Sequence, residues 1–446
     1  MSEHPVIPPP SSSDRCRTLV LCFDGTGDQF DANNSNVVKF CSALKKDDPV
    51  HQMVFYQVRT YTIPQKINSL WSKVTETIDM MMGIKQQWGG YEFLMENYMK
   101  GDMICLFGFS RGAYTARALA GMLHKVGLLP PWNHQQVPFA YKKYSQDNKE
   151  GWDESNEFKK AFSIDVHVEF VGVWDTVNSV GIVPRTLPFT KSDNHIRYFR
   201  HALSLDERRV RFMPNYYKWL TEEDNQFGFH EKDQPEPFCT DVEEVWFSGC
   251  HGDVGGGYVR NDERFCLARI PLRWMIRECF ATNTGIQFHS VQLKQMGLNP
   301  ISLYHKLIPR RPAIFDNKQE ADPHLQNYAR PWPGNTTLRL EDSPEHPFVS
   351  EEHEDLSDAL SDMHDQLQAR RFWWILELLP QQQQYQKDDD MCGTTVTMHM
   401  GRGRPVPKQD DRVKLHRSVD IRRKANLKYH PKANLKWSSM KLKWID

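Results

Sequence analysis

Ser110 occupies the centre of a G-x-S-x-G pattern at residues 108–112, between an apolar run (103–107) and a helix-like run (113–123). A serine on a sharp turn from a strand into a helix needs glycine at both flanking positions, because a Cβ there would clash with the neighbouring strand and helix. Such a turn exposes the hydroxyl beside the amides that open the helix, and those amides can stabilise an oxyanion. The pattern alone arises by chance in chains of this length, but its strand-before and helix-after context favours a nucleophilic serine.

A serine nucleophile requires a general base and an acid that orients the base. In α/β-hydrolases these follow the chain order serine, acid, histidine, and parallel sheets collect ligand-facing groups at the carboxyl ends of their strands. Asp175 ends the strand expected at 166–174, and His251 ends the strand expected at 245–250, just before a glycine-rich stretch. We therefore predict a triad in which His251 takes the proton of Ser110 and Asp175 holds the imidazole in the required tautomer.

Each of these assignments has a structural alternative. An aspartate at a strand end commonly hydrogen-bonds its own backbone, so Asp175 could simply form a turn. Any one of the 18 histidines is structural by default, although its place at a strand end favours His251 as the base. Asp253 is a substitute candidate for the acid, whereas His201 stands in a stretch that reads as helical.

The turn at residues 24–27 closes the first expected strand at the same edge of the sheet. The amides of Gly25 and Thr26 are candidates for one half of an oxyanion hole, and the amide of Arg111 is the candidate for the other half. Asp24 is expected to order this loop rather than to transfer protons. The cysteines and histidines show no zinc-binding spacing, so the sequence predicts neither a metal nor a cofactor.

The elements that must hold these residues alternate between strands and helices. Such alternation predicts an α/β fold with a mostly parallel central sheet and helices on both faces, as in α/β-hydrolases. The expected organisation is a disordered N-terminal tail (1–16), a catalytic domain (17–285), a mixed extension whose apolar helix packs on that domain (286–380), and a basic C-terminal segment (381–446).

Composition excludes several classes of protein. A chain of 446 residues with 39% hydrophobic and 12% aromatic residues is globular and can bury a large core. Its net charge of −1 argues against a nucleic-acid binder. The nine scattered cysteines suit a reduced, cytoplasmic protein, and we expect neither a secretory signal nor a membrane-spanning stretch.

The second half of the chain carries opposed charge blocks. Residues 341–365 hold ten acidic residues and no Lys or Arg, whereas 401–446 hold fourteen Lys and Arg against four Asp. Two solvated surface segments are the favoured interpretation; mutual attraction, or docking of the basic block on anionic lipid, are the alternatives. The apolar run 372–379 predicts a buried helix, with peripheral membrane contact as its alternative, and the glutamines at 381–384 read as a spacer.

Several motifs, in order along the chain, resemble an uncharacterised α/β-hydrolase family related to the catalytic domain of type VI secretion phospholipase effectors. The resemblance spans residues 17–285 and rests on the segments 23–26 (FDGT), 107–117 (FGFSRGAYTAR), 174–177 (WDTV), 201–209 (HALSLDERR) and 246–257 (WFSGCHGDVGGG). It implies a Ser-Asp-His hydrolase whose substrate is a phospholipid or another ester, and at matching positions it supports Ser110, Asp175 and His251. The C-terminal charge blocks look like those of fungal, intracellular members.

We therefore predict that the protein is a cytoplasmic serine esterase or lipase that cleaves a lipid ester through an acyl-enzyme. The alternative is a binding or regulatory protein that keeps the fold without turnover. This alternative rests on residues 56–62, which lack the glycines that the family carries after a tyrosine and that would let backbone approach a substrate closely. Membrane association is compatible with either reading.

Overall fold

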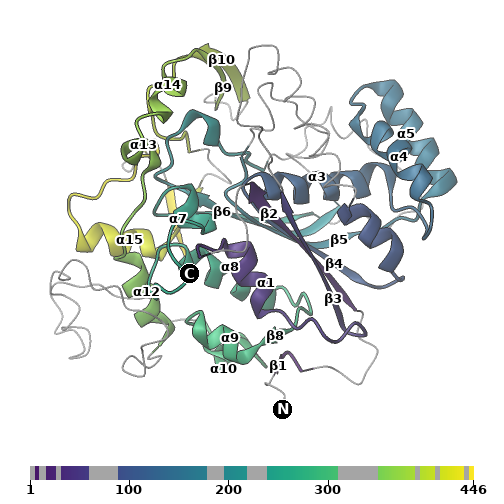
Figure 1. Cartoon of the computed structure of the whole chain (residues 1–446), viewed down its shortest axis with the longest axis horizontal. Coiled ribbons are helices and arrows are strands. Elements are labelled where there is room, and N and C mark those ends of the chain that lie inside the picture. Colours follow the sequence, from purple (N-terminus) through teal and green to yellow (C-terminus); the bar gives the residue numbers. More distant parts are fainter. Residues whose placement is uncertain are drawn as a thin grey trace.

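The structure is a computed structural model, and it describes residues 6–9, 17–26, 32–59, 89–177, 195–217, 239–309, 350–386, 392–406, 412–435 and 441–446. At its centre lies an eight-stranded sheet in the order β12-β11-β7-β6-β5-β4-β2-β3 (Figure 1). Every neighbouring pair in this sheet is parallel. The predicted α/β class with a mostly parallel sheet is therefore confirmed.

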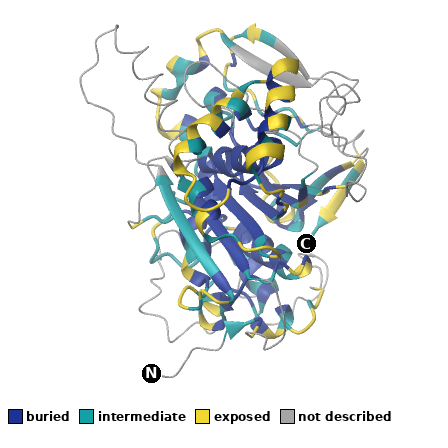
Figure 2. Ribbon diagram, turned by 90° about the vertical axis from the view of Figure 1, so that its right-hand side faces the viewer, coloured by how far each residue is buried: buried dark blue, intermediate teal, exposed yellow. Residues whose placement is uncertain are grey.

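The strands of the sheet are short and largely buried, as expected for a parallel sheet that is covered on both faces. Figure 2 shows the inner strands as a dark blue layer inside the molecule, whereas the edge strand β3 is mostly intermediate and the edge strand β12 is partly exposed. They are β2 (Thr18–Thr26), β3 (Gln52–Arg59), β4 (Met103–Phe109), β5 (Val168–Trp174), β6 (Ile196–Ser204), β7 (Asp241–Phe247), β11 (Arg412–His416) and β12 (Lys441–Ile445).

Alternate side chains of β2 enter two separate cores, because successive residues of a strand point to opposite faces. Val20 and Cys22 belong to the core that also contains residues of α1 (Asn36–Ala43) and α8 (Arg269–Ala281). Leu19 and Leu21 belong to the core built with α3 (Arg111–Val126), α4 (Val137–Ser145) and the helix at 89–97. Ala113, Ala116 and Ala120 of α3 lie in this second core, and their small side chains let the helix approach the sheet closely.

The remaining described elements surround this framework. They are the helices α5 (Lys149–Phe162), α7 (His251–Gly255), α9 (Ser290–Gln295), α10 (Pro300–Leu303), α12 (Glu351–Ala359), α13 (Gln366–Ala369), α14 (Trp373–Glu377) and α15 (Arg417–Ala425), the 3₁₀ turns at His134–Gln136 and Val210–Phe212, and the strands β1 (Val6–Ile7), β8 (Phe288–His289), β9 (Gln381–Gln386) and β10 (Cys392–Thr397). Of the helices that the structure describes, none combines the length and the apolar content needed to cross a bilayer.

The helical expectation for His201 is wrong, because this residue lies in β6 between β5 and β7. The polar residues of β6 masked the apolar pattern by which a buried strand is recognised in a sequence. Arg200 is buried and pairs with Glu278 at 2.5 Å, and His201 is buried with its Nδ1 2.8 Å from Glu244. A strand whose charged residues are paired internally does not show the continuous apolar run by which a buried parallel strand is usually found.

Part of the N-terminal tail is ordered, contrary to expectation. Val6 and Ile7 form β1, which pairs antiparallel with β8. Ile7 packs against the core that contains α1 and α8, which anchors this short strand on the domain. Residues 1–5 and 10–16 lie outside the described part of the chain.

The acidic block does not form a solvated surface where the structure describes it, from residue 350 onward, so that favoured interpretation is wrong there. Its helix α12 packs on α8, and Asp355 and Asp358 lie 2.5 and 2.6 Å from the buried guanidinium of Arg273. Three arginines of α8 recur every four residues and therefore share one face of the helix. The same interface contains the ion pairs Arg264–Glu354, Arg269–Glu354, Arg269–Asp358 and Arg277–Glu351.

The C-terminal part of the chain completes the fold. Strands β11 and β12 extend the central sheet, and the expected glutamine spacer instead forms β9, which pairs with β10. The helix within the apolar run 372–379 is only partly buried, contrary to expectation: Glu377 points inward, whereas most of the apolar side chains remain exposed.

Candidate active site

Ser110 lies between the last residue of β4 and the first residue of α3, as the pattern predicts. Its backbone has φ 59° and ψ −119°, a strained conformation for a residue with a side chain. Its hydroxyl makes no capping bond to the helix. A Cβ on Gly112 would lie 2.2 Å from the carbonyl oxygen of Phe23, and one on Gly108 would lie 2.6 Å from the backbone of Gly112. Both glycines are therefore required by the close approach of β2, β4 and α3.

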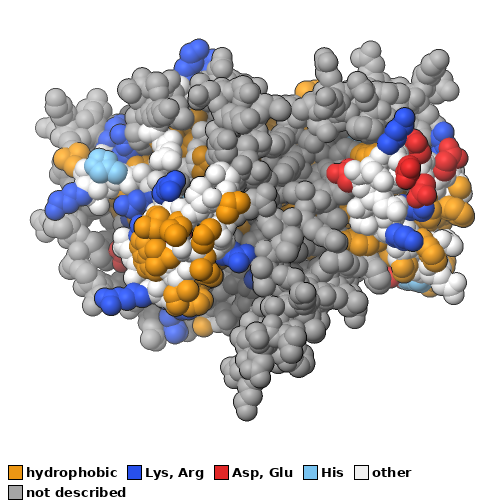
Figure 3. Space-filling model, turned by 90° about the horizontal axis from the view of Figure 1, so that it is seen from above, with side chains coloured by type: hydrophobic (Ala, Val, Ile, Leu, Met, Phe, Trp, Pro, Cys, Tyr) orange, Lys and Arg blue, Asp and Glu red, His pale blue; other side chains and the backbone are white. Residues whose placement is uncertain are grey.

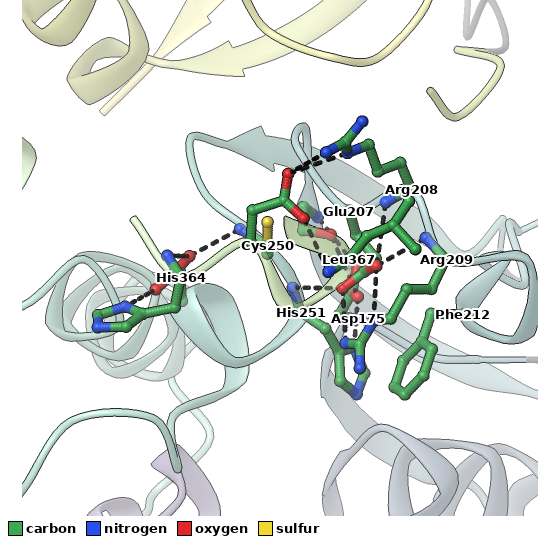
Figure 4. A network of polar contacts seen from close by, with 12 residues as sticks. Asp175, Glu207, Arg208, Arg209, Phe212, Cys250, His251, His364 and Leu367 are labelled. Carbon is green, nitrogen blue, oxygen red and sulfur yellow. Dashed lines mark hydrogen bonds and ion pairs between the residues drawn. The ribbon is translucent and has the colours of Figure 1, made fainter. Parts of the chain in front are cut away.

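Asp175 and His251 are brought together from two strands that flank β6. Asp175 directly follows β5 with φ 41°, and His251 is the first residue of α7, just beyond β7. The imidazole Nδ1 lies 2.6 Å from Asp175 Oδ2 (Figure 4). Both side chains are buried. The acid and the base predicted from strand ends thus form a direct hydrogen bond.

Ser110 lies next to the Asp175–His251 pair, because its own backbone and the preceding residue Phe109 contact the residues of that pair or their neighbours. Its amide donates to the carbonyl oxygen of Trp174 at 3.0 Å, which ties the end of β4 to the residue before Asp175. The ring of Phe109 lies 4.6 Å from the imidazole of His251, centre to centre. Within the described part of the chain, no hydrogen bond joins Ser110 Oγ to His251 Nε2. Such bonds are often long in enzymes without substrate and shorten in the reacting complex.

A buried arginine that the sequence did not reveal holds Asp175 from the other side. Arg404 donates to Asp175 Oδ1 at 2.6 Å and to Oδ2 at 2.9 Å, and it is fully buried. It also donates to the carbonyl oxygens of Ser204 and Phe212. The amide of Ser204 donates to Asp175 Oδ1 at 2.9 Å. The carboxylate is therefore held in one orientation by the backbone of β6 and by the C-terminal part of the chain.

These contacts fix the charges of the pair. Burial raises the pKa of Asp175, but Arg404 and the hydrogen bond from His251 outweigh it and hold that pKa well below its usual range. Burial lowers the pKa of His251 and outweighs the opposing hydrogen bond to Asp175. At neutral pH an ionised Asp175 thus accepts the Nδ1 proton of a neutral imidazole, which leaves Nε2 unprotonated as a base requires.

Aromatic and charged side chains form a wall beside the imidazole of His251. The ring of Phe212 lies edge-on to His251 at 4.8 Å, and the guanidinium of Arg209 lies 3.5 Å above the Phe212 ring (Figure 4). Glu207 binds Arg209 at 2.8 Å and accepts the amide hydrogen of His251 at 3.2 Å. Arg209 also lies over the ring of Trp373, so this wall continues into α14.

In the loop expected to supply one half of the oxyanion hole, one of the two candidate amides already donates a hydrogen bond within the loop. The amide of Gly25 donates to Asp24 Oδ1 at 2.8 Å, and the same carboxylate accepts from Ser35 Oγ and Tyr56 OH at 2.8 Å. Asp24 is buried within these contacts, and its pKa is raised by burial against the opposing hydrogen bonds. Thr26 ends β2, and residues 27–31 lie outside the described part of the chain, as do residues 60–62 of the stretch without glycines.

Two residues weighed at the sequence level have other contacts. The carboxylate of Asp253 accepts from the amide of Cys250 at 2.9 Å and lies 2.8 Å from His364 Nδ1, so it caps α7. His201 accepts from the amide of Thr176 at 3.1 Å through Nε2, while its Nδ1 faces Glu244. With both ring nitrogens engaged, His201 supports the loop after Asp175.

One group of side chains has the spacing of a metal site. Asp355, His416 and Asp446 offer ligand atoms within 4.8 Å of one another. However, Arg273 pairs with Asp355 and Arg417 pairs with Asp446, and these positive charges oppose cation binding at that place.

Comparison with known proteins identifies a family and a relative that this chain resembles. A family model described as "T6SS, Phospholipase effector Tle1-like, catalytic domain" matches residues 17–278. The uncharacterized protein YEL023C of Saccharomyces cerevisiae is 27% identical over 565 residues, covering 95% of this chain and 81% of that protein.

Two solved structures are also similar. One is an uncharacterized protein from Pseudomonas aeruginosa, with a TM-score of 0.34 and 16% identity over 61% of this chain and 46% of that one. The other is the Tle1 effector bound to the VgrG spike from the Type 6 secretion system, with a TM-score of 0.27 and 15% identity over 55% of this chain and 51% of that one. This chain thus matches about half the length of each solved chain.

Proposed function

Because the chain belongs to the family of Tle1-like phospholipase effector catalytic domains, we propose that it is a serine hydrolase that cleaves carboxylic esters of phospholipids or related lipids. The observation that carries the proposal is the buried Asp175–His251 pair, at 2.6 Å, beside a serine on a strained turn. All three residues lie at carboxyl ends of parallel strands, where such sheets bind their ligands.

In the proposed reaction, His251 Nε2 takes the proton of Ser110 Oγ as the oxygen attacks the ester carbonyl carbon. The imidazolium then gives this proton to the departing alcohol, and an acyl-Ser110 ester remains. A water molecule, deprotonated by His251, attacks that ester. The bond to Ser110 Oγ then breaks, Oγ takes the proton back from the imidazolium, and the fatty acid is released. Asp175 stays ionised and stabilises the imidazolium in both halves of the reaction.

The oxyanion formed in each half would be stabilised by backbone amides. The amide of Arg111 opens α3, where the positive end of the helix dipole favours negative charge. For the second donor we favour the amide of Thr26 over that of Gly25, because the latter already donates to Asp24.

We assign Arg404 a positioning role in this reaction. Its two nitrogens fix both carboxylate oxygens of Asp175, and the fork geometry of a guanidinium suits that task. The apolar rings of Phe109 and Phe212 cover the imidazole of His251. They limit the access of water to the imidazole and would pack well against an apolar acyl chain.

The proposal is tested by hydrolysis of a panel of phospholipids in mixed micelles and of p-nitrophenyl esters of different chain lengths. We expect turnover of both, and a loss of at least about a thousandfold in Ser110→Ala. Ser42, an exposed serine on α1, supplies the matched control Ser42→Ala, which should retain full activity. Turnover by neither class of ester would favour the non-catalytic alternative, and equal activity of the two variants would exclude Ser110 as the nucleophile.

A further inference from the structure

The C-terminal part of the chain presents an exposed apolar surface beside the candidate active site, on α14 with its flanking residues and on the segment from the end of β10 to residue 400. We call it the α14 surface, and Figure 3 shows its hydrophobic side chains gathered in one patch. Each of these side chains is 47–68% exposed, which is unusual for so many large apolar residues on neighbouring segments. They are Phe372, Ile375, Leu378, Leu379, Val396, Met398 and Met400.

The two segments of this surface are locked together. Glu377, buried on the inner side of α14, accepts from the amide of Val210 at 2.6 Å and from the amide of Gly401 at 3.0 Å. Its other close contact is His399 Nδ1 at 2.6 Å. A single buried carboxylate thus joins α14, the segment after β10 and the loop after β6. The exposed side chains are therefore held on a fixed platform.

This platform is continuous with the wall of the candidate site. The ring of Trp373 lies 5.7 Å from that of Phe212, which in turn lies 4.8 Å from the imidazole of His251. Arg209 lies over both Phe212 and Trp373. A binding partner on the outer side of α14 would therefore be separated from His251, the proposed general base, by the rings of Trp373 and Phe212.

The exposed charged residues of the segments that form this surface have one sign, within the described residues 366–386 and 392–406. Arg370, Arg371 and Arg402 are exposed at its borders. Between residues 366 and 406, the one carboxylate among the described residues is Glu377, which is buried and engaged. Exposed arginines around large apolar side chains match the anionic headgroups and acyl chains of a bilayer.

We propose that the α14 surface docks the protein on the surface of an anionic phospholipid bilayer and so brings lipid esters to Ser110. This inference rests on the proposed function for its purpose, but binding can be measured without turnover. The side chains would enter the boundary between headgroups and acyl chains while the arginines contact lipid phosphates. This surface lies beyond residue 278, where the family match ends.

The test is flotation of the full chain with vesicles of phosphatidylcholine alone or with phosphatidylserine, in a Ser110→Ala background so that no lipid is consumed. We expect binding to the anionic vesicles that weakens with salt. The double variant Ile375→Glu/Leu379→Glu should lower the partition coefficient at least about tenfold. Ile301, which is 77% exposed on α10, gives the control Ile301→Glu, which should bind as the parent does. Unchanged thermal unfolding would verify that all variants are folded.

Several results would overturn the inference. These are flotation that the double variant does not reduce, equal binding to both kinds of vesicle, or a concentration-dependent dimer that the double variant dissolves without any vesicle binding. The two proposals remain separable. A protein that floats but hydrolyses no ester loses the proposed function and keeps the docking surface, whereas one that hydrolyses soluble esters but never floats loses only the docking surface.

Discussion

Replacement of Arg404 by methionine is a sharp test of how the proposed triad is held. Methionine keeps an unbranched chain that can pack in the space of the arginine stem, although it is shorter than arginine, and it carries no charge. The variant leaves Asp175 with Ser204 and His251 as partners, at 2.9 Å from the Ser204 amide and 2.6 Å from the imidazole. Loss of one partner from a buried ion pair costs about 3–5 kcal/mol. Since domains are stable by about 5–15 kcal/mol, the variant should fold but unfold at a lower temperature.

The effect on His251 follows from distances. Asp175 Oδ2 lies 2.6 Å from His251 Nδ1 and 2.9 Å from an Arg404 nitrogen, so those two nitrogens are at most about 5.5 Å apart. A unit charge at that distance disfavours imidazolium by about 3 kcal/mol at an effective dielectric constant of 20, and by below about 1 kcal/mol in water. Removal of Arg404 should therefore raise the pKa of His251 by about 0.5 to 2 units.

The assay is the pH dependence of kcat/KM on a soluble p-nitrophenyl ester, which makes lipid docking irrelevant. Activity requires neutral His251, so the acid limb should move to higher pH in Arg404→Met. Arg404→Lys keeps the charge without the fork, and it should show an acid limb near that of the wild type with lower kcat. Arg197→Met, at an exposed position, is the matched control. An acid limb that stays in place or moves to lower pH in Arg404→Met would show that the charge of Arg404 does not lower the pKa of His251, even if stability falls as expected.

Three further predictions concern the base, the elbow and a buried carboxyl. Because burial lowers the pKa of His251, the acid limb of wild-type kcat/KM should lie below about pH 6.5, and a limb above pH 7 would contradict this. Gly112→Ala forces a Cβ to 2.2 Å from the carbonyl of Phe23, so it should cost more than about 2 kcal/mol in thermal unfolding; Gly89→Ala, which meets only a flexible side chain at 3.2 Å, should not. Asp206 is a buried carboxyl two residues after β6 that accepts from the amide of Gly249 and the hydroxyl of Tyr429. Burial raises the pKa of Asp206 to about 6, so its contribution to stability is greatest below about pH 4 and is lost as pH rises through 6. Denaturant unfolding should show a smaller loss of stability between pH 4 and 7 in Asp206→Asn, and an identical loss would disprove this.

The sequence predicted those parts of the site that depend on local pattern. An apolar run followed by Asp175, and another followed by His251, marked strand ends because a buried parallel strand and its terminal turn are both local features. Ser110 was marked in the same way by its flanking glycines. The parallel order of the strands then placed the three residues at one edge.

What the sequence could not predict depends on distant partners. Arg404 contacts an aspartate 229 positions earlier, and no local spacing signals such a pair. The acidic residues of α12 were expected to be solvated because their partners, the arginines of α8, lie some 80 residues away; the recurrence of arginine every four residues in that apolar helix was the available signal. His201 was misplaced because Glu244, its buried partner, belongs to the next strand.

Covalent labelling measures directly whether Ser110 is an activated nucleophile. The full chain would be treated with a fluorophosphonate probe, and the modified residue would be located by mass spectrometry of the digested protein. We expect one probe per chain, attached to Ser110, and no labelling of Ser110→Ala or of protein denatured before treatment. Failure of the folded wild type to react, or a probe attached to another serine while Ser110 stays unmodified, would contradict it.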